Sequence, residues 1–446
     1  MNNFPSTIKI GLLGNIGNGN LGDEATFAAV IQNIRRYCPG AKVYGFSENP
    51  QDTWERHHIS VFPMRRERGK SLLSGVMDDK SSEVARATKG FNTFPKKIIR
   101  KLKAHPLIFK PLKTIQRSLI FSLRLFEEIG YFLKCLRIVK GTDLLIVPGS
   151  GHLSDHFGGP WNFPYTLMKW AIIAKLSGTR LAFLSVGAGP LNSPLSRLLI
   201  KTSLSLATYR SFRDSGSKRL VEKIGGKGEN PIFPDLAHSL HLNGSSPRFY
   251  KNESRPLVGI NPFPHYDYRY WPVGNPRAYS SYVNRLASFA SWLIENGYRI
   301  LFFATQIRAD PPVIEDIRSI LEKNINLDLK ELLLVPSIRS LNDLISQLSM
   351  TDFVVATRFH AILISFLLNK PVLGIANHHK MINLMEAVGE SEYILNIDGF
   401  DLSSLIERFT LLRSNREAVR DRIKSRITDF RRALDVQYEQ VFSIFK

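Results

Sequence analysis

Residues 356–380, ATRFHAILISFLLNKPVLGIANHHK, connect two apolar runs through a short segment that can form a helix. The run that ends at Ala356 begins at residue 352 and is typical of a buried strand, and so is the run at residues 371–376. Residues 361–368 between them are apolar and compatible with a helix, which the following Asn-Lys-Pro sequence ends. This stretch therefore predicts a strand–helix–strand unit of an α/β fold.

Three side chains with functional chemistry stand at the turns of this unit. Arg358 and His360 come where the first strand ends and the helix begins, and Lys380 follows the second strand. Ligands of open α/β sheets bind at the carboxyl ends of the strands. The free N–H groups and the dipole of a helix N-terminus also favour anions. The three residues therefore predict a compact site for an anionic substrate.

Strand-like apolar segments alternate with helical ones along both halves of the 446-residue chain. This alternation is typical of parallel sheets with helices on both faces. Strands are expected near residues 8–14, 41–47, 58–63, 143–147, 180–187 and 208–212, and again near 257–261, 299–305, 332–335, 352–356 and 372–376.

A segment rich in Ser, Pro and Asn at residues 242–256 separates the two halves and predicts a linker. We therefore expect an α/β protein with two Rossmann-like domains that face a central cleft. The predicted domains are residues 1–245 and 256–412. Residues 413–446 are expected to form a long helix that packs back onto the body.

The composition excludes several classes of protein. The hydrophobic fraction of 43% is ordinary for a globular protein. The two cysteines, Cys38 and Cys135, exclude a disulfide scaffold and fit a reducing compartment. The first residues lack the pattern of a signal peptide, and no apolar run reaches the length of a membrane span. These features predict a cytoplasmic protein.

The net charge of +21 is concentrated in one part of the chain. Residues 61–140 hold 19 Lys and Arg against 6 Asp and Glu, and we interpret residues 64–140 as a basic insert in the first domain. Such a segment can attract nucleic acid, anionic lipid or an acidic glycan, or it can be a solvated surface. Nucleic acid is disfavoured because no reader motif accompanies the charge.

Residues 107–140 of this insert have apolar residues at helical spacing and predict an amphipathic helix. Ile115, Leu119, Leu123, Phe126, Ile129, Leu133 and Leu136 form its apolar stripe. Most such stripes cover a core. The alternative is that this basic helix lies on an acidic membrane surface.

The loop after the first predicted strand contains Gly17, Gly19 and Gly22 in the spacing of a dinucleotide-binding turn. Asp23 and Glu24 follow at the helix start, where their charges would repel a pyrophosphate, so we discount this function. Two interpretations remain, a flexible loop before a capped helix or a loop whose polar side chains bind sugar hydroxyls. The candidates for such contacts are Asn15, Asn18 and Asp23.

Polar and glycine residues follow the other predicted strands of the first half. Arg213 repeats the arrangement of Arg358, with a strand end before it and a helix start after it, although a surface ion pair with Asp214, a very common arrangement, would also explain it. Glycines at such points allow a ligand to approach the backbone closely. The remaining candidates to line the cleft are Gly149, Gly151, His152, Asp155, Gly187 and Asp235.

The candidate residues suggest chemistry on a small anion. Arg213, Arg358, His360 and Lys380 could converge in a cleft between the domains. Arginine pairs bidentately with carboxylate or phosphate, and histidine suits proton transfer near neutral pH. We therefore expect group transfer from a small, doubly anionic donor. No constellation of metal ligands is evident, and we expect no metal.

Taken together, the motifs resemble those of the polysaccharide pyruvyl transferase family. The resemblance covers about residues 8–389 and departs from the family pattern at Ser150, between two glycines, and at Asn377. The motifs that carry it are Gly14-Asn15 through Gly22-Asp23-Glu24, residues 148–155, 186–191 and 211–214, Pro234-Asp235, and residues 357–360 with Lys370-Pro371 and Lys380.

The resemblance implies a glycosyltransferase-B-like fold and an enzyme that transfers the pyruvyl group of phosphoenolpyruvate to a sugar, forming a pyruvate ketal. It implies His360 as the general acid, Arg213 and Arg358 as ligands of the donor's phosphate and carboxylate, and Lys380 as a counter-ion for the leaving phosphate. Phosphoenolpyruvate is then a co-substrate, and no further cofactor is expected.

The expected partner is a glycan acceptor, either a cell-surface polysaccharide such as an exopolysaccharide or its lipid-linked precursor. Peripheral contact with the inner membrane face through residues 64–140 is also expected. Two alternatives stay open. One is a nucleotide-sugar-dependent glycosyltransferase of the same fold, and the other is a non-catalytic protein that binds an acidic glycan or lipid surface.

Overall fold

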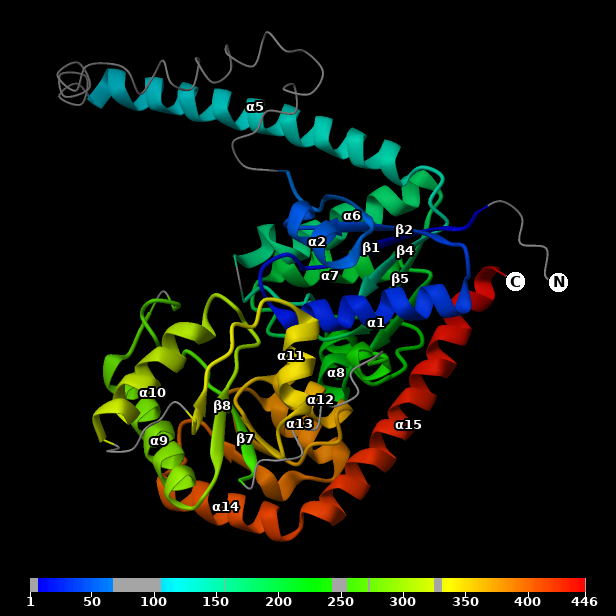
Figure 1. Ribbon diagram of the computed structural model, residues 1–446. Coiled ribbons are helices and arrows are strands. Elements are labelled where there is room, and N and C mark those ends of the chain that lie inside the picture. Colours follow the sequence, from blue (N-terminus) through cyan, green and yellow to red (C-terminus); the bar gives the residue numbers. More distant parts are fainter. Residues whose placement is uncertain are drawn as a thin grey trace.

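The computed structural model describes residues 7–66, 106–156, 158–242, 255–271, 273–324 and 331–445. Each half of the chain forms one six-stranded parallel sheet with helices packed on it (Figure 1). The predicted fold class is therefore confirmed. Most of the predicted linker, and residues 67–105 of the predicted basic insert, lie outside the described residues.

The first sheet has the strand order β3-β2-β1-β4-β5-β6. At its centre, Leu12 of β1 lies opposite Gly45 of β2 on one side and Ile146 of β4 on the other. The apolar strands are buried on both faces, which explains why they read as continuous apolar runs. The strands are β1 (Lys9–Leu13), β2 (Lys42–Ser47), β3 (Ser60–Pro63), β4 (Leu144–Pro148), β5 (Arg180–Val186) and β6 (Tyr209–Phe212).

The second sheet repeats this topology in the order β12-β11-β10-β7-β8-β9. Its central pair joins Ala356 of β10 to Asn261 of β7. The strands are β7 (Leu257–Asn261), β8 (Arg299–Phe302), β9 (Leu333–Leu334), β10 (Phe353–Ala356), β11 (Val372–Ala376) and β12 (Ile394–Asn396). In each sheet the chain reverses its direction of winding at the central pair, and ligands bind at this point in such folds.

Helices connect the strands and cover both sheets. The helices of the first half are α1 (Leu21–Tyr37), α2 (Pro50–His57), α5 (Pro106–Val139), α6 (Phe163–Ser177), α7 (Pro194–Ser205) and α8 (Ser215–Lys223). Those of the second half are α9 (Pro276–Glu295), α10 (Asp310–Asn324), α11 (Leu341–Ser349), α12 (Phe359–Leu367), α13 (His379–Val388), α14 (Leu402–Ser414) and α15 (Arg416–Phe442). Within the described part of the chain, no helix is long and apolar enough to span a membrane.

Helix α1 lies between the two domains and belongs to both cores (Figure 1). Leu21, Ala25 and Ala29, four residues apart, pack into the core of the second sheet. Phe27 and Ile34 pack into the core of the first sheet. The helix therefore holds the two sheets together through two apolar faces.

The amphipathic helix predicted at residues 107–140 is α5, but most of the described part of its apolar stripe faces solvent. Leu123, Phe126, Ile129 and Leu133 of that stripe are exposed, whereas Leu136 is partly buried against the core of the first sheet. The helix instead buries Tyr131 and Cys135, which pack in the core of the first sheet. The alternative in which the stripe covers a core is wrong for these exposed residues, because the buried positions recur every four residues on the opposite face and include a tyrosine and a cysteine.

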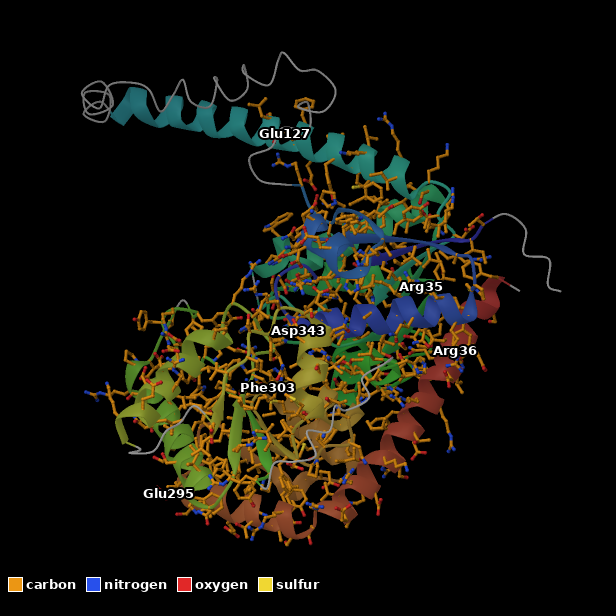
Figure 2. All side chains as sticks on the ribbon, in the orientation of Figure 1. Arg35, Arg36, Glu127, Glu295, Phe303 and Asp343 are labelled. Atoms are coloured by element: carbon orange, nitrogen blue, oxygen red, sulfur yellow. The ribbon has the colours of Figure 1, made fainter. Side chains whose placement is uncertain are left out.

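Helix α15 runs from the second domain back to the first. Its first half buries Val419 and Ile423 in the core of the second sheet, and its second half buries Leu434 and Tyr438 in the core of the first. Arg36 of α1 reaches it through an ion pair of 2.9 Å with Asp435 (Figure 2).

The fully buried Gln437 fastens α15 to the first sheet, and its replacement tests this attachment. Its amide oxygen accepts a hydrogen bond of 3.1 Å from Ser185 Oγ, and its amide nitrogen donates to Ser211 Oγ. Because Gln437→Ala removes the amide from two buried hydroxyls, we expect the free energy of unfolding to fall by about 1–3 kcal/mol. Urea denaturation measures this change.

The matched control is Glu439→Ala, an exposed position on the same helix. This control should change the free energy of unfolding by less than about 0.5 kcal/mol. Equal effects of the two substitutions would contradict the role of Gln437.

Candidate active site

The two domains meet where α1 and α12 begin. Gly22 lies in the first turn of α1, where the side chain of Asn20 accepts its N–H at 3.1 Å. The imidazole of His360 packs directly on Gly22, so closely that a Cβ atom there would lie 2.1 Å from His360 Nδ1. Only glycine allows this approach. The contact places His360 of the second domain against the first turn of the first.

Lys380 crosses the same junction from the start of α13. His378 caps this helix by accepting the Lys380 N–H at 3.2 Å. On the opposite wall lies the loop after β4, where a Cβ atom added at Gly151 would lie 3.2 Å from Lys380 Nζ. The glycine therefore leaves room for the ammonium group in the cleft.

Arg213 enters the cleft from the carboxyl end of β6. Its Nη1 donates to Asp235 Oδ2 at 3.0 Å, and its guanidinium lies 5.0 Å from the ring centre of Phe359, on the second domain. A Cβ atom at Gly187 would lie 2.4 Å from Arg213 Nη2, so this glycine is also required for the approach. Arg213, His360 and Lys380 therefore come together, and we call them the cationic cluster.

Three buried polar atoms in this region have no hydrogen-bond partner among the described residues. They are Arg213 Nη2, His360 Nε2 and His152 Nδ1. Buried polar groups in native proteins are nearly always paired, and each exception calls for an explanation such as a catalytic role or a bound water or ion. His152 completes this wall of the cleft, because its Nε2 accepts the Asn15 N–H at 3.3 Å.

The electrostatics of the cluster favour an anion. Burial lowers the pKa of His360 to about 4, with Arg213 and Lys380 lowering it further and Asp235 opposing them. Burial and Arg213 also lower the pKa of Lys380 to about 8, although nearby carboxylates act in the opposite direction. The positive charges disfavour one another, and a bound anion would relieve this repulsion.

Asp23 supplies a titratable carboxyl at the same cleft. Burial raises its pKa to about 7, helped by the charges of Glu24 and Asp235. Ser150 Oγ donates to Asp23 Oδ1 at 3.4 Å, and Asn20 Nδ2 donates to Oδ2 at 2.8 Å. A carboxyl with this pKa can accept or give up a proton near neutral pH.

The contacts of Arg358 lie outside the cationic cluster. Its Nε donates to Asp310 Oδ1 at 2.9 Å and its Nη2 to the same oxygen at 2.5 Å, while its guanidinium lies 4.8 Å from the ring centre of Phe263. Asp310 is fully buried and also accepts the Gln306 N–H at 2.9 Å. Arg358 therefore fastens the start of α12 to the turn before α10. Its Nη1 has no hydrogen bond to the described residues.

The glycine-rich loop before α1 joins the domains. Gly17 and Gly19 have a φ of +81°, which favours glycine. Ile307 N donates to the Gly19 carbonyl at 3.0 Å, and Leu21 N donates to the Thr305 carbonyl at 2.8 Å. Asn18 takes part through its carbonyl, which accepts from the side chain of Gln306 at 3.2 Å. The loop thus docks on the second domain.

Glu24 has a structural partner on each side. Its carboxylate accepts the Gly17 N–H at 3.0 Å and pairs with His57 Nε2 at 2.6 Å. Asp155 is used similarly, because its carboxylate accepts the N–H groups of Asn192 and Ser193 at 3.2 and 2.9 Å. These bonds hold loops at the cleft.

Gly149 is close to the first sheet, since a Cβ atom there would lie 2.8 Å from the Ser185 carbonyl oxygen. This contact requires glycine after β4 for packing.

Asp310 and Phe359 are partners of the two arginines that the local sequence pattern does not predict. Asp310 carried one signal, an acidic residue opening a helix, but Arg358 is 48 residues further along the chain. Such a pairing depends on the order of strands in the sheet, so the spacing of residues along the sequence does not predict it. Among the described residues, no group of three or more His, Cys, Asp or Glu side chains is placed to hold a metal ion.

Solved structures show the same fold at low sequence identity. A UDP-GlcNAc 2-epimerase from Neisseria meningitidis matches with a TM-score of 0.57 at 11% identity, covering 98% of this chain and 100% of that one. The UDP-GlcNAc 2-epimerase from Methanocaldococcus jannaschii gives 0.55 at 8%, covering 91% and 92%. Anabaena Alr3699/HepE gives 0.51 at 13%, covering 98% of each chain. These similarities show the glycosyltransferase-B-like arrangement.

Family membership comes from the sequence itself. No protein with a curated description matches the chain. The family model of polysaccharide pyruvyl transferases, however, matches residues 20–379, which include Arg213 and His360 and end one residue before Lys380. The chain therefore belongs to the polysaccharide pyruvyl transferase family, and it is an enzyme of polysaccharide biosynthesis.

Proposed function

We propose that the enzyme transfers the pyruvyl group of phosphoenolpyruvate to two hydroxyls of one sugar, forming a cyclic pyruvate ketal. The observation that carries this proposal is the pair of buried, unpartnered nitrogens, Arg213 Nη2 and His360 Nε2, beside the ammonium group of Lys380. A small ligand with two anionic groups and a proton-accepting carbon fits these atoms. Phosphoenolpyruvate is such a ligand, and the proposed reaction needs no other cofactor.

Different residues of the cationic cluster can bind the two anionic groups of the donor. The guanidinium of Arg213 suits bidentate contact with a carboxylate or phosphate, whereas Lys380 acts as a point charge. Neutralising the phosphate as it leaves would stabilise the transition state. Arg358 remains a predicted donor ligand through its Nη1, because its other nitrogens are held by Asp310.

The proton transfers balance with two residues. With the donor's negative charges bound beside it, His360 takes up a proton and gives it to the methylene carbon of the donor, and the first sugar hydroxyl attacks the adjacent carbon. Phosphate then leaves, and the second hydroxyl attacks the same carbon to close the ketal. The hydroxyls release two protons, of which one restores His360 and the other departs with phosphate. We assign the acceptance of hydroxyl protons to Asp23, whose pKa of about 7 suits it.

The proposed acceptor is a cell-surface polysaccharide or its lipid-linked precursor. We propose that the enzyme meets it in the cytoplasm, at the inner face of the membrane. The acceptor-side wall would be formed by the loops that carry Asn15, Asp23 and His152.

A nucleotide-sugar-dependent glycosyltransferase is the second candidate. One observation favours it, because Alr3699/HepE was solved in complex with UDP on the same fold. In that case the cationic cluster would hold a diphosphate. Donor binding distinguishes the two functions.

Calorimetric titration of phosphoenolpyruvate tests the donor. We expect saturable binding to the wild-type protein and a loss of about ten- to a hundred-fold in affinity for Arg213→Ala, because a charge-assisted hydrogen bond is removed. The control is Arg219→Ala, an exposed arginine on α8, which should bind like the wild type. The same titration of Arg358→Ala decides whether that arginine binds the donor or only supports α12.

If UDP binds to the folded wild-type protein and phosphoenolpyruvate does not, the glycosyltransferase function replaces this one. Weak binding to both ligands would contradict an anion site in the cleft.

The pH dependence of donor binding tests Lys380 separately. Its pKa of about 8 means that the free enzyme loses this positive charge as the pH rises through 8. Affinity for phosphoenolpyruvate should therefore fall between about pH 7.5 and 9, where a phosphate monoester with a second pKa of about 6 is already almost fully ionised. Lys380→Arg keeps the charge and should reduce the fall to the part that ionisation of Asp23, with its pKa of about 7, contributes. An equal alkaline fall in this variant would exclude Lys380 as its origin.

Substitutions of His360 and Asp23 test whether these residues act in turnover without contributing to donor binding. We expect His360→Ala to lower kcat by about a hundredfold or more while donor affinity stays within about three-fold, because general acid catalysis is lost. Asp23→Asn should also lower kcat with little effect on donor binding. A steady-state assay of phosphate release measures both. Full activity of either variant would remove that residue from the mechanism.

A further inference from the structure

Helix α5 has one face toward the protein and one toward solvent. At 100° per residue, Tyr131 and Cys135 point toward the first sheet's core. Of the described large apolar side chains on its solvent side, we call the four most exposed the outer face. Its members are Leu125, Phe126, Ile129 and Leu133, with exposed fractions of 50%, 73%, 47% and 46%. Figure 1 shows α5 on the outer side of the first domain, away from the second.

The acidic residues of α5 are both turned toward the body of the protein. Glu127, labelled in Figure 2, pairs with Arg66. Glu128 pairs with Lys169 of α6 at 2.8 Å and accepts a hydrogen bond of 3.1 Å from Tyr165. Both glutamates of the helix are therefore paired with cations of the body, and they do not neutralise positive charges on the solvent side of α5.

The remaining charges of the helix region are positive. Residues 106–140 contain seven Lys and Arg but only these two glutamates. Lys134 and Arg137 are exposed next to the outer face, and neither forms an ion pair with a described residue. The solvent side of α5 thus combines large apolar side chains with an excess of positive charge.

We propose that the outer face of α5 lies in the interface of an anionic lipid membrane. An amphipathic helix with apolar side chains on one face and cations beside them inserts between lipid headgroups and acyl chains in this way. Anionic lipids add an attraction for each lysine or arginine near the surface. A second copy of the chain fits less well, because a symmetric contact of two outer faces would bring together two sets of the same excess positive charge.

The membrane contact and the catalytic cleft use different residues. None of Arg213, His360, Lys380 and Asp23 belongs to α5. The proposed function supplies only the biological reason for this membrane contact, because a lipid-linked acceptor would be presented at the membrane surface. Vesicle binding can therefore hold or fail independently of donor binding.

Vesicle co-sedimentation of the full chain tests the proposal. We expect the wild type to bind vesicles of phosphatidylcholine with phosphatidylglycerol, to bind pure phosphatidylcholine weakly, and to dissociate in high salt. Phe126→Ser combined with Ile129→Ser and Leu133→Ser should lower the partition coefficient about ten-fold or more. The matched control combines Leu176→Ser and Leu198→Ser, leucines of α6 and α7 with exposed fractions of 62% and 60%.

Three results would overturn the proposal. The first is absence of wild-type binding to anionic vesicles, and the second is equal loss in the outer-face and control variants. The third is a halved molar mass of the outer-face variant in light scattering, which would assign the face to a second copy of the chain. Phosphoenolpyruvate titration of the same variants should match the wild type. Failure of that titration in every variant, with vesicle binding intact, would instead reject the proposed function.

Discussion

The packing of His360 on Gly22 is the contact on which the site depends. It requires the absence of a side chain at Gly22, because even a methyl group would overlap the imidazole ring. The contact fixes the start of α12 on the start of α1, and α1 is buried in both cores. The carboxyl edges of two separate sheets are thereby held face to face. Arg213 and Lys380 reach the same place from opposite domains only because this junction sets their separation.

Once the junction is closed, its charges determine what it can hold. Burial and mutual repulsion lower the pKa values of His360 and Lys380, and the carboxylates of Asp235 and Asp23 offset only part of this effect. The free site is therefore electrostatically unfavourable, and an anion with two charged groups would stabilise it. The domain contacts made by the Gly19 loop and by α15 supply the free energy that keeps like charges together. Function and stability are coupled at this point, as in many enzyme sites.

The sequence predicted the fold well because parallel, buried strands leave long apolar runs. It also predicted that Arg213, His360 and Lys380 belong near strand ends, and sheet order then brings them together. Contacts that depend on tertiary packing could not be predicted from the sequence. Arg358 pairs with Asp310 across 48 residues, and the polar helix α2 lacks an apolar stripe because Thr53 is its one buried residue. The apolar stripe of α5 was seen correctly, but periodicity cannot tell which of two faces meets the core.

Two groups of positive charges in this protein lie in environments with different selectivity. Inside the cleft, a few cations are desolvated and rigidly held, so they favour a small anion whose groups match their positions. On α5 the cations are hydrated and beside exposed apolar side chains, where salt screens them and no fixed geometry is imposed. Such an arrangement selects a surface rather than a molecule. Both glutamates of α5 form ion pairs on its inner side. The ion pairs that attach the helix to the body therefore also create the difference in charge between its two faces.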